Sequence, residues 1–491
     1  MSSFRRAARW PETWILTALL AGRVLMAADA GLGRDESAYW YWAWHGLDAS
    51  YSLVTGLAVR AATALGGDAP FVARIPSLLA GIAAVLLLIR ATHRLGVPAR
   101  TAVAAGVVLA TVPTLSFSGA FIHPDVFLVL AVVLFAERLG ALAADGPTAR
   151  TLIPLAAAAA VAALTKLTGG LLLAPAAWLL WRHRRDPGAA AGGAVILATG
   201  ALLLASLDFR IVGGLRDFGR FADGVPQFSR WLFFAGENLI WAGPALLVAV
   251  GVGIAALRRP GLRSRWPLAV TFGLWMAFFA VFALLGQAKA NWLVPAFVLM
   301  VPPAVVMWER RGRPTWGAVL VIASLGITAA QGTAVLLPGQ PVLWKAFQEL
   351  AWVQHLSPSY AVHAGERERT VSPTRNWIQR AEEFRENAAG DARLHDARWI
   401  ASNDYGLAFH IAHRRGRHVQ VLLPGDPVFA RTCGAEPPPD AEVLYVSRTD
   451  RPPAAWAADF EDVRELPAGE GCFKDLRVWS CRSRRQEGNT S

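Results

Sequence analysis

Two adjacent acidic residues, Asp35 and Glu36, directly follow the first hydrophobic segment of the chain. Acidic side chains are scarce in this part of the sequence, and an ionisable residue beside a membrane helix is a candidate for function. A positioned carboxylate can accept the proton of a hydroxyl group as that hydroxyl attacks another centre. The alternative is a solvated acidic turn that caps the following helix, because acidic side chains stabilise a helix N-terminus.

The aromatic residues behind this pair alternate along the chain as Trp40, Trp42 and Trp44. Amphipathic rings gather at the membrane–water boundary, and aromatic faces can also stack on sugars. The segment therefore predicts either an interfacial aromatic belt or a sugar platform. In both cases the acid pair is a carboxylate site at the surface of a bilayer, within reach of a substrate anchored in lipid.

The elements that must position these residues are hydrophobic helices, since 54% of the 491 residues are hydrophobic. Apolar stretches of about 17–25 residues are long enough to cross a bilayer, and a soluble protein has no need of so many. The expected fold is an α-helical polytopic membrane protein with about eleven transmembrane helices. The predicted spans are 13–30, 71–90, 101–119, 125–143, 151–165, 167–181, 190–207, 238–257, 266–285, 292–308 and 315–336.

Arginine clusters between the spans set the expected orientation, because basic residues favour the cytoplasmic side. They also account for the net charge of +12 without nucleic acid. The odd number of spans then places the C-terminal part outside, together with the acid pair, the 208–237 loop and its arginines. The clusters lie at 5–9, 90–100, 150, 182–185, 258–265 and 310–313.

Acidic residues are concentrated near the C-terminus, where 21 of the 36 Asp and Glu follow residue 340. This shift predicts a transmembrane domain, 1–340, and an extracytoplasmic C-terminal soluble α/β domain, 341–491. Residues 37–66 are too polar to span and predict juxtamembrane helices in the first outer loop. In the C-terminal domain we expect a helix at 375–388 and strands at 398–402, 418–423, 443–446 and 476–481. Its cysteines, Cys433, Cys472 and Cys481, could form one disulfide, and the sequence does not pair them.

Several short patterns, in order along the chain, resemble the GT-C type of polytopic glycosyltransferase, and specifically the group with the lipid A aminoarabinose transferase and the protein O-mannosyltransferases. The acid pair with Tyr39 is similar to an Asp-Glu-Ala-Tyr-Tyr element in the first outer loop. The late Asn291-Trp292 resembles an Asn-Trp-Pro-x-Pro-Ala element. The patterns lie at 33–40, 73–77, 123–125, 164–169, 290–296 and, more weakly, 401–408.

The resemblance implies transfer of a sugar from a polyprenyl-phosphate donor to a lipid A, glycolipid, glycan or protein acceptor, by an inner-membrane, multi-pass enzyme that is expected to invert the sugar. A lipid-linked donor agrees with the lack of a Gly-rich nucleotide loop. The alternative is a transporter or flippase of lipid-linked sugars, which has no need of a base at the surface. The interrupted-helix repeats frequent in transporters are not evident.

Under this hypothesis Asp35 is the general base, Glu36 orients it or binds sugar hydroxyls, and Asp125 assists or binds the sugar. Asp125 could equally cap a helix after Pro124. Donor phosphate or sugar would contact Arg74, Lys166, Lys289, Asn291, Trp292 and Tyr39. Three of them have a structural alternative: Arg74 could snorkel, Lys166 could pair with Asp125 or Glu36, and Trp292 could be an anchor.

A bound divalent metal is possible, with His123 and Asp48 as weak candidate ligands. The family usually carries an acidic residue, or Asp-His, followed by Pro-Pro after the first juxtamembrane helix. Here the segment 47–54 has neither Pro-Pro nor a basic residue, so Asp48 is at most a partial substitute. His123 has the alternative of an interface histidine. No other cofactor is expected.

Overall fold

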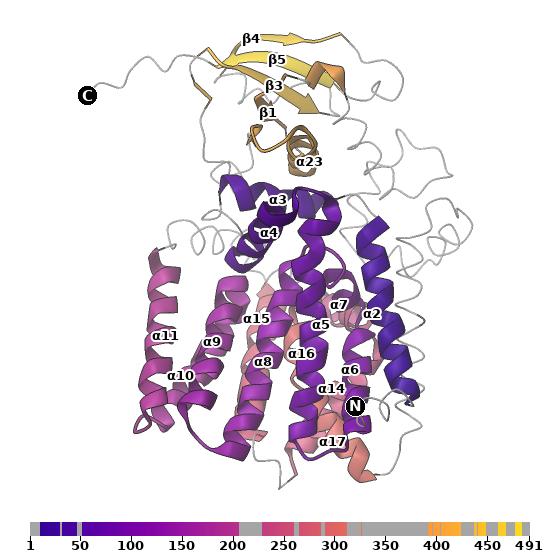
Figure 1. The fold of residues 1–491 in the computed structure, drawn as a ribbon, viewed down its shortest axis with the longest axis vertical. Coiled ribbons are helices and arrows are strands. Elements are labelled where there is room, and N and C mark those ends of the chain that lie inside the picture. The colour runs from indigo at the N-terminus through magenta and orange to yellow at the C-terminus, as the bar shows by residue number, and fades with distance from the viewer. Residues whose placement is uncertain are drawn as a thin grey trace. The chain divides into compact units, whose positions relative to one another are not determined.

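The structure is a computed structural model, and Figure 1 shows its fold. It describes residues 10–29, 32–46, 52–205, 228–259, 265–285, 290–311, 326, 391–394, 396–402, 404–423, 437–438, 440–447, 460–467 and 477–483. The predicted positions Asp48, Lys289, Cys433 and Cys472, the helix at 375–388 and nearly all of the span at 315–336 lie outside these residues.

The chain forms two compact units. Unit 1 contains Met1–Asp29 and Arg74–Ser372, and unit 2 contains Ala30–Ala73 and Pro373–Ser491. The first loop therefore clusters with the C-terminal part of the chain, although the sequence suggested a simple division at residue 340. Sequence composition does not reveal this grouping, because the loop and the C-terminal part are separated by all of the hydrophobic helices.

Unit 1 is a bundle of apolar helices whose long members run roughly parallel in Figure 1. Its core joins small and branched side chains from most of these helices, such as Val132, Ala159 and Leu246. The helices are α2 Pro11–Asp29, α5 Pro70–Arg94, α6 Ala99–Ala110, α7 Pro113–Ser118, α8 Pro124–Asp145, α9 Ala149–Thr165, η1 Leu167–Leu172, α10 Leu173–Arg182, α11 Pro187–Ala205, α13 Phe228–Ala242, α14 Pro244–Leu257, α15 Arg265–Leu285, η2 Ala290–Trp292, α16 Val294–Val298 and α17 Val301–Arg311.

Several predicted spans agree closely with single helices, and others are divided. Among the described residues, three helices are long and apolar enough to cross a membrane: Pro70–Arg94, Pro124–Asp145 and Trp266–Leu284. The predicted span 101–119 is divided into α6 and α7, and 238–257 into α13 and α14. New helices begin at Pro113 and Pro244, because proline has no N–H to bond within a helix and fits its first turn.

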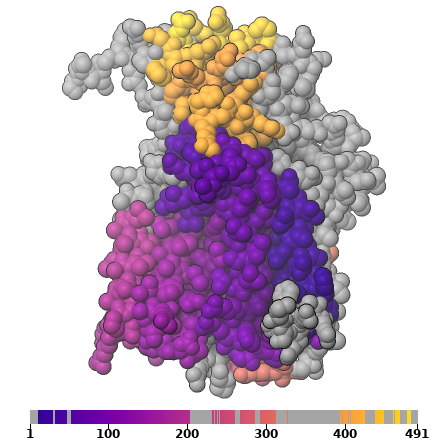
Figure 2. All heavy atoms as spheres, viewed as in Figure 1, coloured from indigo at the N-terminus to yellow at the C-terminus, as the bar shows by residue number. Residues whose placement is uncertain are grey.

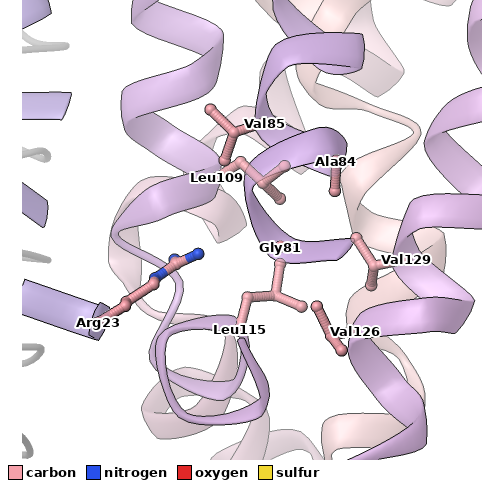
Figure 3. Close-up of a pocket in the computed structure, with 8 residues that line it drawn as sticks. All are labelled: Arg23, Gly81, Ala84, Val85, Leu109, Leu115, Val126 and Val129. Carbon is pink, nitrogen blue, oxygen red and sulfur yellow. The ribbon is translucent and has the colours of Figure 1, made fainter. Parts of the chain in front are cut away.

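Arg23, within α2, faces other helices of unit 1, one of the two placements expected for a cation in a hydrophobic segment. Its Nη2 donates to Ala110 O at 2.9 Å. Gly119 leaves room for the guanidinium, since a Cβ there would lie 3.2 Å from Arg23 Nη1. Figure 3 shows the side chain beside a small apolar cavity of about 10 Å³, the size of one water molecule.

Unit 2 contains a five-stranded sheet with the order β2-β1-β3-β5-β4. Strand β1 is parallel to β2 and β3, and β5 is antiparallel to β3 and β4. All four predicted strands are present: 398–402 agrees with β1, 418–423 with β2, 443–446 with β3 and 476–481 with β5. Strand β4 was not predicted. The elements are α3 Arg34–His45, α4 Leu53–Gly66, η4 Ala392–Leu394, β1 Trp399–Ala401, α23 Tyr405–Arg415, β2 Gln420–Leu422, β3 Glu442–Ser447, β4 Phe460–Glu465 and β5 Arg477–Ser483.

Helix α23 lies between the sheet and α3 in Figure 1. Segments far apart in the sequence thus pack together in unit 2, and Figure 2 shows the C-terminal residues in contact with residues near the N-terminus. Cys481, on β5, is buried and is a free thiol. Burial raises the pKa of this thiol to about 12, so it is protonated and inert at neutral pH.

Candidate functional site

The acid pair of the first loop forms the first turn of α3 in unit 2, and its two members have different environments. Asp35 is exposed, whereas Glu36 is buried and 4% exposed. Glu36 Oε2 accepts a hydrogen bond from Gly33 N at 2.8 Å, so this carboxylate caps the helix. The capping alternative thus describes the contact of Glu36, and Asp35 is the member of the pair that a substrate can reach.

The aromatic residues of α3 are part of the core of unit 2. Trp40 and Tyr41 are fully buried, and Trp42 is 5% exposed. Tyr39 is 7% exposed, and its ring packs edge-on against Trp42 with centroids 5.5 Å apart. Neither an interfacial belt nor a sugar platform describes these rings, because their faces are covered by protein.

A second group of predicted residues comes together in unit 1. Asp125 is 1% exposed, and both of its carboxylate oxygens are occupied. Lys166 Nζ donates to Oδ1 at 2.8 Å, and Asn291 Nδ2 donates to Oδ2 at 2.5 Å. The pairing of Lys166 with Asp125 is one of the alternatives left open by the sequence. These three residues are called the Asp125 cluster.

A break in a helix places Lys166 in this cluster. α9 ends at Thr165, Lys166 is extended, and the 3-10 helix η1 begins at Leu167. A side chain at Gly169 would collide with the carbonyl oxygen of Ala162, so the close return of the chain depends on this glycine. The break agrees with the predicted boundary between the spans 151–165 and 167–181.

Trp292 lies beside the cluster and is held by other aromatic side chains. Its backbone oxygen accepts from Trp275 Nε1 at 3.2 Å, and its ring centroid is 5.7 Å from that of Phe279. Lys166 Nζ is 5.6 Å from the centroid of the Trp292 ring, within the range of a cation–π contact. Trp292 is therefore both an anchor in the bundle and a neighbour of the buried ammonium group.

His123 is the N-cap of α8, and its Nδ1 accepts from Asp125 N at 3.2 Å. The same nitrogen lies 3.6 Å from Asp125 Oδ2, a contact that is an ion pair only when the imidazole is protonated. Within the described ranges no three His, Cys, Asp or Glu side chains form a group that could hold a metal ion.

Arg74, the remaining predicted phosphate contact, is fully buried in unit 1. Its Nη1 donates to Ala27 O at 2.9 Å, at the end of α2. The guanidinium carbon lies 4.8 Å from the centroid of the Phe121 ring. These contacts join α2, α5 and the segment before α8, and they differ from the snorkelling alternative, in which the charged group would reach water.

Sequence reasoning missed two sets of charged residues. Glu137, on α8, is fully buried and contacts three arginines, Arg90, Arg94 and Arg138. Asp68 and Arg417 form an ion pair in unit 2 with Nη2 2.9 Å from Oδ1. Glu137 lies in an uninterrupted apolar stretch and could have been found by its isolation, whereas nothing in the sequence relates position 68 to position 417.

Comparison with known proteins confirms the resemblance to GT-C type polytopic glycosyltransferases. Residues 50–207 match the family described as dolichyl-phosphate-mannose-protein mannosyltransferase. This region contains Arg74, Asp125 and Lys166 but neither Asp35 nor Asn291. A sequence search of curated proteins gives no match.

Two solved structures of ArnT from Cupriavidus metallidurans are similar to this chain over almost their whole length. The one bound to undecaprenyl phosphate has a TM-score of 0.62 and 15% sequence identity, covering 95% of this chain and 97% of that chain. The one in the apo state has a TM-score of 0.59 with the same identity and coverage. At this identity the similarity establishes the fold.

Proposed function

We propose that this protein is a membrane glycosyltransferase that moves a sugar from a polyprenyl-phosphate-linked donor to a hydroxyl group of a lipid, glycan or protein. The match of residues 50–207 to a family named for dolichyl-phosphate mannose carries the proposal. The ArnT-like fold supports it, since that protein was crystallised with undecaprenyl phosphate. Helices long and apolar enough to cross a membrane fit a substrate that is itself a lipid.

In the proposed reaction Asp35 accepts the proton of the acceptor hydroxyl as its oxygen bonds to the anomeric carbon. The bond between that carbon and the phosphate oxygen breaks at the same time, and polyprenyl phosphate leaves with the electron pair. A single displacement of this kind inverts the configuration of the sugar. The exposure of Asp35 supports this role, because a base must reach its substrate.

The donor phosphate is assigned to the Asp125 cluster. A buried ammonium group is costly unless an anion is near, and Lys166 already has one in Asp125. Sharing Lys166 between Asp125 and an incoming phosphate would stabilise the charge that develops on the leaving group. Asn291 Nδ2 is a second donor, held by its bond to Asp125 Oδ2. In this proposal Asp125 orients both donors rather than acting as a base.

The proposal places the reaction at the outer face of the cytoplasmic membrane, with the C-terminal domain extracytoplasmic. The arginine-rich loops support this orientation.

The test uses the purified full chain in vesicles that contain undecaprenyl phosphate carrying radiolabelled mannose or aminoarabinose, with membrane extract as acceptor. We expect label in the acceptor and free undecaprenyl phosphate in equal amounts. Asp35→Asn should lower the rate by about 10²- to 10⁴-fold, the usual contribution of a positioned base. Asp462→Asn is the matched control, an exposed acid of unit 2 on β4.

Two results would contradict the proposal. Label that crosses the vesicle membrane while still attached to the lipid would identify a carrier rather than a transferase. Transfer by Asp35→Asn at the rate of the Asp462→Asn control would remove Asp35 from the mechanism.

A further inference from the structure

The helix that carries Asp35 is held by the C-terminal part of the chain. α3 packs against α23, and the Tyr41 ring lies 4.8 Å from that of Phe409. The hydroxyl of Tyr41 also accepts a hydrogen bond from Val421 N, 2.9 Å away on β2. β2 is an edge strand of the sheet that the described residues form, so Tyr41 bonds the backbone of β2 on the side away from β1.

Asp68 joins three segments of unit 2. Its carboxylate accepts from Trp40 Nε1 at 2.9 Å, and from Arg417 Nε and Nη2 at 3.1 and 2.9 Å. Its backbone oxygen lies 3.0 Å from His413 Nε2. The turn that presents Asp68 begins at Gly67, whose φ of 81° favours glycine. Asp68 thus ties α3 to the end of α23 and to Arg417, the second residue after that helix.

Arg417 extends this connection along the same face of α3, from Trp40 to Trp44. Its guanidinium lies over the Trp44 ring, 3.4 Å from the centroid. Its Nη2 also donates to Thr63 O at 3.2 Å, and Trp44 Nε1 donates to Thr63 Oγ1 at 3.2 Å. One side chain of the C-terminal part therefore contacts both α3 and α4. A planar guanidinium can bond a carboxylate and cover a ring at once, which a lysine cannot do.

We propose that Asp68 and Arg417 are positioning residues, which fix the orientation of α3 and thereby of the Asp35 carboxylate. This inference rests on the proposed function. Asp35 is exposed in the first turn of α3, so its placement depends on the helix, and Trp40, Tyr41 and Trp44 are among the residues whose described contacts hold the helix. The C-terminal domain therefore acts on the reaction through α3.

The test compares Arg417→Gln, Asp68→Asn and the double variant in the transfer assay. Arg477→Gln is the matched control, since it removes an arginine from an ion pair on the same sheet, between β5 and β4. Each single variant should lower kcat per folded molecule by about tenfold, because small misplacements of a reacting group cost up to about a hundredfold. The KM for the lipid-linked donor should not change. The double variant should lose no more than the single ones, since both break the same connection.

Further readouts separate positioning from a general loss of structure. Arg417→Lys keeps the charge but not the two-nitrogen fork, so its kcat should fall between those of the wild type and Arg417→Gln. Hydrogen exchange should become faster in α3 while the strands keep their protection. A kcat per folded molecule equal to that of Arg477→Gln would overturn the inference, and so would a loss that only follows the amount of folded protein.

The failure of the inference can be told apart from the failure of the proposed function. If Asp35→Asn is inactive while Arg417→Gln and Asp68→Asn match the control, the base stands and the positioning role does not. If Asp35→Asn transfers at the rate of the wild type, the proposed role of Asp35 itself fails, and with it the inference.

Discussion

The two units bury polar groups in different ways. Unit 1 buries opposite charges against one another: Asp125 pairs with Lys166, and Glu137 contacts the Nε atoms of Arg90 and Arg94 at 3.1 and 3.0 Å. Unit 2 packs aromatic and histidine rings between α3 and α23, such as Trp40 against His413 with centroids 4.9 Å apart. A histidine is the side chain whose charge can change closest to neutral pH. The comparison teaches that the phosphate-binding candidate rests on an ion pair, whereas the support of Asp35 includes histidine rings and is sensitive to pH.

Asp125→Asn should have the largest effect on stability. The change leaves Lys166 buried and without the Asp125 carboxylate, and breaking a buried pair in this way costs about 3–5 kcal/mol. The double variant Asp125→Asn with Lys166→Met should recover most of that stability while remaining inactive. Thermal unfolding in detergent measures both. Equal unfolding temperatures for the single variant and the wild type would show that the pair does not hold unit 1 together.

Glu137→Gln should cost less, about 1–3 kcal/mol, although Glu137 is the more deeply buried acid. The side chains of its partners Arg90, Arg94 and Arg138 are 54%, 25% and 18% exposed, so water can reach all three when the carboxylate is lost. Donor affinity and kcat should stay at wild-type values, because the proposal assigns Glu137 no part in transfer. Lower donor affinity in this variant would contradict the contrast between Asp125, which is assigned to the donor site, and Glu137, which is not.

Acid should loosen unit 2 by a smaller amount. Burial lowers the pKa of His413 below its ordinary 6.5, outweighing the hydrogen bond to Asp68 O that raises it. Burial likewise lowers the pKa of His45. A lowered pKa means that, as the pH falls, the unfolded state binds a proton before the folded state does. The stability that the neutral histidines contribute to unit 2 is therefore fully present above about pH 6.5 and is lost as the pH falls toward the folded-state pKa. For His413 the loss is at most about 1.4 kcal/mol per pH unit.

Hydrogen exchange of the full chain at pH 7.5 and 5.5, corrected for intrinsic rates, measures this loss in α3 and α23. His413→Gln should reduce the difference between the two conditions. If acid lowered the protection from hydrogen exchange only in the helices of unit 1, then unit 1 and not unit 2 would be the pH-sensitive unit, contrary to this prediction.

The helices and strands were largely predictable from the sequence, and the assembly of unit 2 was not. Apolar periodicity located α5, α8 and α9, and a predicted boundary agreed with the break at Lys166. β4 escaped prediction because its register with β5 shifts between Glu461 and Arg464, which disturbs the alternation of its side chains. The division of the spans 101–119 and 238–257 into two helices each was not predicted, because composition alone does not show where an apolar stretch is interrupted.

The candidate site was predictable in part. The approach of Asn291 to Asp125 joins positions that only a resemblance could connect, and that resemblance named both. The burial of Tyr39 and Trp40 contradicts the expected aromatic belt, because rings suited to a membrane surface are equally suited to a protein core. The partner of those rings lies in α23, and pattern analysis of single segments contains no information on such distant packing.

The composition of unit 2 also bears on the order in which the protein is made. A ribosome completes residues 30–73 long before it begins residues 373–491, and the two segments belong to one compact unit. Domains generally fold as units during synthesis, beginning at the N-terminus. The rings of Trp40 and Tyr41, fully covered in the folded protein, are therefore without α23 and β2 until translation has passed residue 422. A chain released before that point would present an uncovered aromatic helix to chaperones and proteases, so maturation of the first loop waits for α23 and β2.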